Sequence, residues 1–278
     1  LLMHTMIKSI LSFILLLCFS GAAFSQQPAI KYGSNPAAGK YYEVRGIKMY
    51  TEVYGKGKPL LLIHGNGGSM NAFSKTIPYF ARKYRVIAVD SRAQGKTNDA
   101  NDSLSFEMMA DDFAALLDRM HVDSAYVIGW SDGGINALLL AMRHPEKVIK
   151  LAATGANLTP DSSGIVPDVW RDEQKQYESD KNKIWKTAKE KNDWKIFMLD
   201  WLQPNIPFTA LRAIQCPSLI ICGDHDLIPI EHTTKIYRHI PRAYLWVVPN
   251  SGHATLMDHR DEFNKGVDSF FQNPYHPF

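Results

Sequence analysis

One serine of this chain lies between two glycines, in residues 129–133 with the sequence GWSDG. An apolar run, 125–128, precedes this segment and residues with helical spacing, 135–142, follow it, which predicts a sharp turn from a strand into a helix. In so tight a turn, side chains at the flanking positions would collide with the backbone, and the serine is forced into a strained conformation. Ser131 is therefore a candidate nucleophile, although a five-residue pattern of this kind also recurs by chance.

Two residues further along the chain could activate this serine. A serine hydroxyl is a weak nucleophile unless a base removes its proton, and the base needs an acid that orients it. His253 follows the last apolar run, and Asp226 follows the apolar run before it, so Ser131, Asp226 and His253 are expected to meet as nucleophile, acid and base. Asp224 competes for the role of the acid, but it lies nearer the strand end, where it could cap a turn, and Asp226 is preferred.

Acyl transfer also needs hydrogen-bond donors for the oxyanion that forms during the reaction. The N–H of Asp132 directly follows the candidate nucleophile, and the N–H of Asn66 lies in the glycine-rich segment 64–68. We expect these two amides to form an oxyanion hole, in which the loss of one donor typically costs roughly 2.7 to 4 kcal/mol. The glycine-rich segment could instead be a phosphate loop, but no Gly-Lys-Ser/Thr follows it, so that interpretation is rejected.

Short apolar runs alternate with segments of helical spacing, which predicts an α/β fold with a mostly parallel central sheet flanked by helices. The predicted strands, expected to be buried on both faces, are 60–63, 86–89, 125–128, 148–153, 219–222 and 244–248. The predicted helices are 70–83, 105–121, 135–144, 231–240 and 260–271. Residues 41–54, with a turn at Arg45-Gly46, predict an antiparallel hairpin. Ligands bind at the carboxyl ends of the strands in open parallel sheets, which is where the candidate residues are expected.

Residues 157–208 interrupt this alternation, because they contain no convincing strand and many charges. We expect a helical cap insertion here, between the segments 26–156 and 209–278 that form the core. Its large aromatic residues could be the core of this small subdomain or could line a lid that excludes water from an active site, and both can hold. These residues are Trp170, Tyr177, Trp185, Trp194, Phe197 and Trp201.

Composition limits the classes of partner. The chain has 278 residues, of which 45% are hydrophobic, and a net charge of +3 with basic residues dispersed among acidic ones. This fits one large domain and a small-molecule substrate, and it gives no sign of nucleic-acid binding. Cys216 and Cys222 flank a predicted strand, about 20 Å apart if extended, so they are expected to be buried free thiols. The sequence gives no indication of the oligomeric state.

The first residues predict export. Lys8 precedes the apolar run 10–19, and small residues at Ala23 and Ser25 suit a signal peptidase, so residues 1–25 are predicted to be a signal peptide. The apolar run is shorter than the roughly 20 residues that span a bilayer, so no stable membrane insertion is expected after cleavage. We expect an exported protein that is periplasmic or secreted.

Taken together, the motifs resemble those of the α/β-hydrolase superfamily over nearly the whole chain after the predicted signal peptide. They are, in order, His64-Gly65, Asp90-Ser91-Arg92, Gly129-x-Ser131-x-Gly133, Gly223-x-x-Asp226 and Gly252-His253. The segment 129–134, together with Cys216-Pro217 before a strand and Gly223, is similar to the biphenyl hydrolase-like and valacyclovir hydrolase group of serine esterases. That resemblance implies a serine esterase for amino-acid esters, in which Asp132 helps to bind the ammonium group of the substrate.

Physical chemistry gives Asp132 two interpretations. A carboxylate at the start of a helix is favourable with the helix dipole by about 0.3 to 1 kcal/mol, which is a purely structural role. As a trap for a cation, it would attract a unit charge at about 4 Å by roughly 4 kcal/mol at an effective dielectric of 20. An anion near the oxyanion would oppose catalysis, so in the second case the side chain must point away from the oxyanion hole.

The sequence therefore predicts an exported serine hydrolase that cleaves carboxylic esters through an acyl-enzyme, with no metal or organic cofactor. Lactonase, carbon–carbon bond hydrolase and peptidase activities stay open, because fold and triad do not select among them. A non-catalytic small-molecule-binding protein of the same fold is the alternative from another class.

Overall fold

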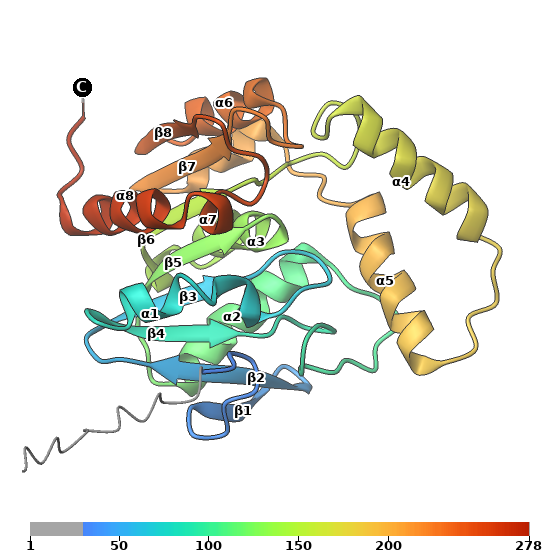
Figure 1. Ribbon diagram of the computed structural model, residues 1–278, viewed down its shortest axis with the longest axis horizontal. Coiled ribbons are helices and arrows are strands. Elements are labelled where there is room, and N and C mark those ends of the chain that lie inside the picture. Colours follow the sequence, from blue (N-terminus) through green and yellow to red (C-terminus); the bar gives the residue numbers. More distant parts are fainter. Residues whose placement is uncertain (1–29, 278) are drawn as a thin grey trace, which may run out of the picture. The chain divides into compact units, whose positions relative to one another are not determined.

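The computed structural model describes residues 30–277, so the predicted signal peptide, 1–25, lies outside the described residues. Lys31–Phe278 form one compact unit, and its described part is built around an eight-stranded sheet with the order β1-β2-β4-β3-β5-β6-β7-β8 (Figure 1). The strands are β1 (Gly39–Val44), β2 (Ile47–Tyr54), β3 (Lys58–Ile63), β4 (Tyr84–Val89), β5 (Ala125–Trp130), β6 (Val148–Thr154), β7 (Ser218–Gly223) and β8 (Ala243–Val248). Strands β3 to β8 run parallel, and β2 pairs with β4 in the antiparallel direction.

The predicted hairpin is present at one edge of the sheet. Val44 pairs with Ile47, and only Arg45 and Gly46 connect the two strands. Both connecting residues have positive φ, 43° and 84°, which is the conformation of the tight type I′ turn. The hairpin therefore adds an antiparallel pair of strands to a sheet that is otherwise parallel.

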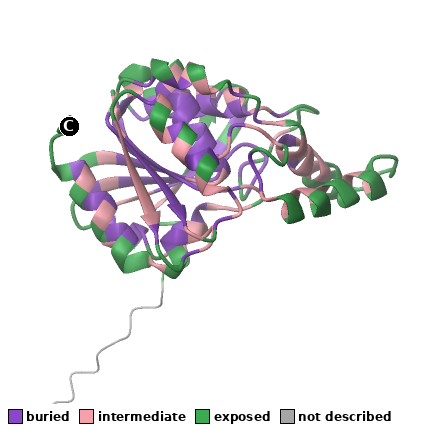
Figure 2. Cartoon of the chain, turned by 90° about the horizontal axis from the view of Figure 1, so that it is seen from above, coloured by how far each residue is buried: buried purple, intermediate pink, exposed green. Residues whose placement is uncertain are grey.

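Helices cover both faces of the sheet, and alternate side chains of the strands pack against them. In β3, Leu61 and Ile63 face one core and Leu60 and Leu62 face the other, and all four are fully buried. Full burial of one such side chain stabilises the fold by about 1.5 to 3 kcal/mol. Figure 2 shows these buried strands between helices with exposed outer surfaces. The first core includes α2 (Phe106–Arg119), α3 (Asp132–Arg143) and α6 (Ile230–His239), and the second includes α1 (Ile77–Phe80), α7 (Thr255–Asp258) and α8 (Arg260–Gln272).

Two predicted helix ends are confirmed by their local contacts. The hydroxyl of Ser105 accepts a hydrogen bond from the N–H of Met108, 3.1 Å away, and caps α2. Helix α3 ends at Arg143, one residue before His144 and the proline that follows it. The residue before a proline avoids the helical conformation, which explains the stop.

The predicted helix 70–83 is wrong. The structure has the short 3-10 helix η1 (Met70–Phe73) and then the single-turn helix α1, because Pro78 lacks an N–H and its ring would clash with a carbonyl one turn earlier. A second correction concerns β8, which is only half-buried along most of its length. It pairs with β7 alone at the edge of the sheet, so it is not buried on both faces. The remaining short helices are η2 (Pro145–Lys147) and η3 (Phe208–Ala213).

Residues 157–208 contain two helices and no strand. These helices, α4 (Pro167–Asp180) and α5 (Ala188–Leu202), lie to one side of the sheet in Figure 1. A capping box fixes the start of α5, because the side chains of Thr187 and Glu190 each accept a hydrogen bond from the other's backbone N–H.

Stacked aromatic rings hold the two helices of this cap together. Tyr177 of α4 stacks on Trp201 of α5 with ring centroids 4.8 Å apart, and Trp185 stacks on Trp194 at 5.5 Å. Trp170 and Phe197 extend the same stack. Because α4 has no fully buried residue, these half-buried rings form most of the contact between the helices.

Cys216 and Cys222 are both free thiols, as predicted, with Cys222 buried and Cys216 half-buried. Within residues 30–277, no helix is long and apolar enough to cross a membrane.

Candidate active site

Ser131 occupies a strained turn between β5 and α3. Its φ and ψ are 56° and −121°, β5 ends one residue before it, and α3 begins one residue after it. A Cβ atom on Gly129 would clash with the carbonyl oxygen of Gly133, and one on Gly133 would clash with the carbonyl oxygen of Ile63. The predicted strain and the need for both glycines are confirmed, and a backbone of this kind costs of order 1 to 3 kcal/mol, which the surrounding contacts offset.

The structure brings Ser131, His253 and Asp226 into one chain of hydrogen bonds. Nε2 of His253 lies 2.9 Å from Oγ of Ser131, and Nδ1 of the same ring lies 2.7 Å from Oδ1 of Asp226. The imidazole is 19% exposed, whereas the Asp226 side chain is fully buried. This geometry lets a histidine take a proton from the serine while a carboxylate stabilises the resulting imidazolium.

The structure also separates the two candidate acids. Oδ1 of Asp226 accepts a hydrogen bond from the N–H of Ile228 at 3.0 Å, which directs its carboxylate toward His253. The carboxylate of Asp224 instead accepts from the N–H groups of Asn250 and Ser251 at 2.9 and 3.0 Å. Asp224 therefore caps a turn, and Asp226 alone of the two contacts the histidine.

The glycine-rich segment after β3 passes close to Ser131. A Cβ atom on Gly65 would lie 3.0 Å from Cβ of Ser131, so the next residue, Asn66, is brought to the nucleophile by close backbone approach. Among residues 30–277, the N–H groups of Asn66 and Asp132 donate to no other residue. Neither of the amides predicted as oxyanion donors is thus engaged by another described residue, and the role itself stays a prediction.

The comparisons with known proteins agree with this geometry. The model of the alpha/beta hydrolase fold family matches residues 58–210. The chain belongs to this family. It is a hydrolase of the α/β fold, and its curated relatives include enzymes named as serine hydrolases.

Two relatives and one solved structure illustrate the similarity. The mouse (Mus musculus) protein "Serine hydrolase BPHL" is 28% identical over 88% of this chain and 90% of its own length. The 2-hydroxymuconate semialdehyde hydrolase of Pseudomonas sp. (strain CF600) is 27% identical over 85% of this chain and 95% of its own. A meta-cleavage product hydrolase from Pseudomonas fluorescens has the same fold, with a TM-score of 0.69 and 24% identity over 86% of this chain and 99% of that one.

In this α/β-hydrolase, two carboxyl groups of the cap lie near Asp132, the residue that follows Ser131. Asp132 is 3% exposed, and its Oδ2 accepts a hydrogen bond from the side-chain amide of Asn66 at 3.0 Å. Asp200 of α5 lies close enough to Asp132 for the two carboxyls to shift each other's pKa, and the negative charge of Asp132 also raises the pKa of Glu173 of α4. Burial raises the pKa of all three carboxyls, that of Asp200 most, because it also faces the charge of Asp132.

Asp200 and Glu173 are not among the site residues predicted from the sequence. Each lies in a helix among many other charged residues, and nothing in the local pattern separates it from a solvated surface charge. Only the packing of the cap against the core brings them to Asp132. Within residues 30–277, no group of three histidine, cysteine, aspartate or glutamate side chains is placed to hold a metal ion.

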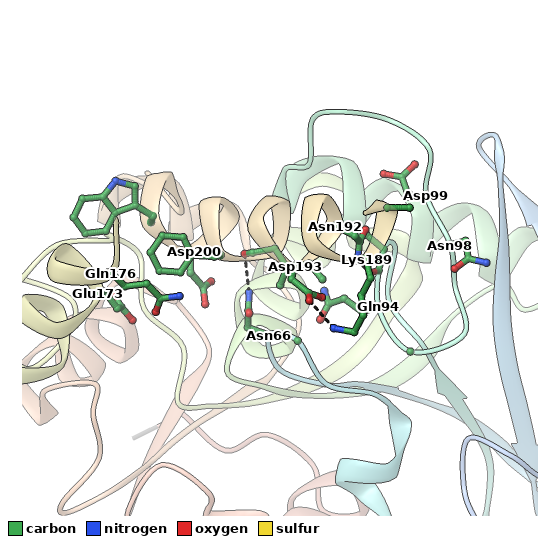
Figure 3. Close-up of a pocket in the computed structure, with 17 residues that line it drawn as sticks. Asn66, Gln94, Asn98, Asp99, Glu173, Gln176, Lys189, Asn192, Asp193 and Asp200 are labelled. Carbon is green, nitrogen blue, oxygen red and sulfur yellow. Dashed lines mark hydrogen bonds and ion pairs between the residues drawn. The ribbon is translucent and has the colours of Figure 1, made fainter. Parts of the chain in front are cut away.

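A cavity of about 880 Å³ lies between the cap and the core of the hydrolase (Figure 3). Its wall includes Asn66 and Gly67 after β3, Gln94 after β4, and Asp200 and Glu173 from the cap. Ser131 and His253 are not part of the wall, whereas Asn66, whose neighbour Gly65 packs against Ser131, is. Figure 3 shows Asn66 between Gln94 and Asp200 in this view. Two of the stacked aromatic rings of the cap, Phe197 and Trp201, also line the cavity.

A buried ionic cluster joins the Asp90-Ser91-Arg92 motif to the cap. The Arg92 side chain is 2% exposed and contacts Asp112 of α2 at 2.6 Å and Asp99 at 3.0 Å. Lys195 of α5 contacts the same Asp99 at 3.1 Å. Arg92 therefore connects the loop after β4 to α2 and, through Asp99, to the cap that covers the cavity.

Proposed function

We propose that this α/β-hydrolase is a serine hydrolase that cleaves carboxylic esters through an acyl-enzyme. The observation that carries the proposal is the chain of hydrogen bonds from Asp226 through His253 to Ser131 at a strained strand-to-helix turn. The curated relatives named as serine hydrolases support it.

The proposed reaction has two steps. Oγ of Ser131 attacks the ester carbonyl while Nε2 of His253 takes the hydroxyl proton, which it then donates to the leaving alcohol. Asp226 holds the imidazole in place, and the N–H groups of Asn66 and Asp132 stabilise the oxyanion. Water then attacks the acyl-enzyme, with His253 as its base, and releases the acid.

We further propose that the preferred esters carry an ammonium group, as in amino-acid esters. Three carboxyl groups lie near one another beside the turn at Ser131, those of Asp132, Asp200 and Glu173. The Asp132 carboxyl accepts a hydrogen bond from the Asn66 side chain and lies close enough to Asp200 of the cap to shift its pKa, so its charge acts toward the cap. A cationic substrate would compensate these carboxyls, whereas a carboxylate would be repelled.

Carbon–carbon bond hydrolysis is the second candidate. The similarity to a 2-hydroxymuconate semialdehyde hydrolase favours it, since that relative covers most of the chain. The same serine and histidine would serve, with a carbanion in place of an alkoxide as the leaving group. The carboxyl cluster argues for the cationic ester instead, because the named semialdehyde substrate has no ammonium group.

Export also stays a proposal, and it rests on residues 1–25 alone. Expression of the full chain in a bacterium, followed by cell fractionation and N-terminal analysis, would test it. A mature chain that begins at Gln26 outside the cytoplasm is expected, and an uncleaved chain in the cytoplasm would contradict export.

A matched pair of esters tests the proposed reaction on the purified chain that begins at Gln26. L-norvaline methyl ester and methyl pentanoate differ only in the ammonium group. We expect both to be hydrolysed, with kcat/KM about tenfold or more higher for the norvaline ester, and no turnover by Ser131→Ala. Equal rates would remove the ammonium preference. Turnover of a meta-cleavage-type dienoate without turnover of either ester would support the second candidate.

A further inference from the structure

One buried amide in the cavity wall has no partner within the protein. The Gln94 residue is 4% exposed, and among residues 30–277 neither Nε2 nor Oε1 of its side chain has a hydrogen-bond partner. Buried side-chain amides in folded proteins are nearly always hydrogen-bonded, and an unpaired one is costly. Gln94 lies in the wall of the cavity under the cap, where Figure 3 shows its side chain. A molecule bound in the cavity is therefore a candidate hydrogen-bond partner for the Gln94 side chain.

The backbone of Gln94 is fixed, so this amide is presented in a defined position. Its N–H donates to the carbonyl of Ser91 at 3.0 Å, and its own carbonyl accepts from the N–H of Thr97 at 3.0 Å. These bonds hold the residue in a tight turn directly after β4. A group held in place before a ligand arrives loses little conformational freedom on binding, which is what a recognition site needs.

Two other polar side chains of the wall already have partners of their own. Asn192 donates to the carbonyl of Ala93 at 2.7 Å. Asp99 is held by Arg92 and Lys195. With these groups engaged, Gln94 is left as a wall residue whose donor and acceptor have no partner among the described residues.

We propose that Gln94 is a substrate-binding subsite for a carboxamide or peptide group. A side-chain amide offers one donor and one acceptor side by side, and the complementary partner offers one acceptor and one donor in the same arrangement. An ionised carboxylate has no donor and would also face the carboxyl groups of Asp200 and Glu173 in the same wall, where Asp193 is paired with Lys189. An apolar group would leave Gln94 unpaired. A neutral amide satisfies both atoms without adding negative charge.

This subsite deepens the proposed ester hydrolysis and rests on it. A volume of about 880 Å³ is large for a simple amino-acid methyl ester, since ligand pockets of about 300 to 1,000 Å³ hold drug-sized molecules. With the carboxyl groups of Asp200 and Glu173 and the amide of Gln94 in one wall, the cavity suits a substrate that carries both an ammonium group and an amide. Peptide-like esters have this combination.

Two ester series test the subsite, one with the variable group on the acid and one with it on the alcohol. The first compares the methyl esters of L-glutamine and L-methionine with the α-methyl ester of L-glutamate. The second compares L-alanine esters of glycolamide, isobutanol and glycolic acid. In at least one series we expect kcat/KM for the carboxamide to exceed that of the apolar isostere about tenfold, and the carboxylate to be the poorest substrate.

Gln94→Met then separates recognition from a structural role. It should abolish the carboxamide preference and leave kcat/KM for the apolar isostere unchanged or higher. The melting temperature should stay equal or rise, because an unpaired buried amide has been removed. Gln176→Met is the matched control, since it removes another amide of the same wall that is exposed to solvent, and it should keep the preference.

Several results would overturn the subsite. No carboxamide preference in either series would do so, and so would a preference that survives in Gln94→Met. A lower melting temperature of Gln94→Met with no change in selectivity would assign the residue to a water-filled structural contact. If no ester is hydrolysed, the proposed function fails on its own, and calorimetric titration with L-glutaminamide tests the subsite separately. Tighter binding to the wild type than to Gln94→Met supports it, and equal binding contradicts it.

Discussion

The carboxyl groups of Asp132 and Asp200 lie close enough to shift each other's pKa, although one begins helix α3 of the core and the other lies in helix α5 of the cap. Two carboxylates so close cannot both stay charged, and a shared proton resolves the conflict. Burial and the charge of Asp132 raise the pKa of Asp200 well above its usual value. Because Asp132 directly follows Ser131, the charge state of the cap is coupled to the candidate site.

Asp200→Asn should stabilise the folded protein at neutral pH. A carboxyl whose pKa is raised by folding binds its proton more tightly in the folded chain than in the unfolded one. Each rise in pH above the ordinary carboxyl pKa of about 4 therefore lowers the stability of the wild type until the raised pKa is passed. The variant escapes this loss and should be more stable by about 1 kcal/mol or more at about pH 7, with the difference shrinking toward about pH 4.

Urea unfolding of wild type and Asp200→Asn between about pH 4 and 8 checks this pH dependence. Asp193→Asn is the matched control, because Asp193 lies in the same helix but its exposed carboxylate pairs with Lys189. Its effect should stay within about 0.5 kcal/mol at every pH. A variant at Asp200 that is less stable than wild type at neutral pH would refute the shared proton.

Asp226→Asn should lower kcat for ester hydrolysis about 10⁴-fold, because an amide can hold the wrong tautomer of His253 and cannot stabilise its charged form. Asp224→Asn should change kcat less than about tenfold, since Asp224 caps the backbone of Asn250 and Ser251 and does not contact the histidine. Steady-state kinetics of both variants, with circular dichroism as a check of folding, decide between the two acids. Equal losses in both variants would contradict the assignment.

Gly133→Ala should destabilise the fold by about 3 kcal/mol or more, because its Cβ would clash with the backbone carbonyl of Ile63 and neither group can move without shifting a core strand. Gly252→Ala is the control, since the nearest atom to its Cβ lies 3.9 Å away. Thermal unfolding should separate the two by well over the roughly 0.5 kcal/mol expected of a tolerated change. Similar melting temperatures would mean that the turn at Ser131 is less tightly packed than described.

Arg92→Met should cost about 3 to 5 kcal/mol of stability, since it leaves the buried carboxylates of Asp112 and Asp99 without their shared partner. Arg171→Met removes an arginine from an exposed ion pair with Asp168 and should change stability by less than about 0.5 kcal/mol. Denaturant unfolding measures both. A small loss in Arg92→Met would show that Lys195 or another cation replaces the missing charge.

Local sequence patterns predicted most of the framework, because its signals are short-range. The two-residue turn at Arg45, the strand before Ser131 and the polar residues after each strand are all encoded within a few neighbouring positions. In a parallel sheet the strand ends meet at one edge, so Ser131, Asp226 and His253 could be predicted to converge although they lie far apart in the chain.

What the sequence could not predict depends on packing between distant segments. Asp200 and Glu173 have the spacing of ordinary surface residues on cap helices, and only the position of the cap against the core makes them neighbours of Asp132. The sequence around Gln94 likewise gives no signal, since the lack of hydrogen-bond partners for its side-chain amide depends on which groups the neighbouring side chains bind. Pro78, in contrast, is a signal in the sequence that the expected helix 70–83 should break. The apolar residues around it have helical spacing, but a proline inside a helix is more disruptive than that spacing is favourable.

The most direct test of the proposed hydrolase is labelling of the purified chain with a fluorophosphonate, followed by intact-mass and peptide analysis. A serine activated by His253 and Asp226 reacts with this probe, whereas an ordinary serine does not. We predict a single covalent adduct on Ser131 in the wild type and no adduct in Ser131→Ala. A folded wild-type chain that stays unlabelled would contradict the nucleophilic role of Ser131 and favour a non-catalytic binding protein of the same fold.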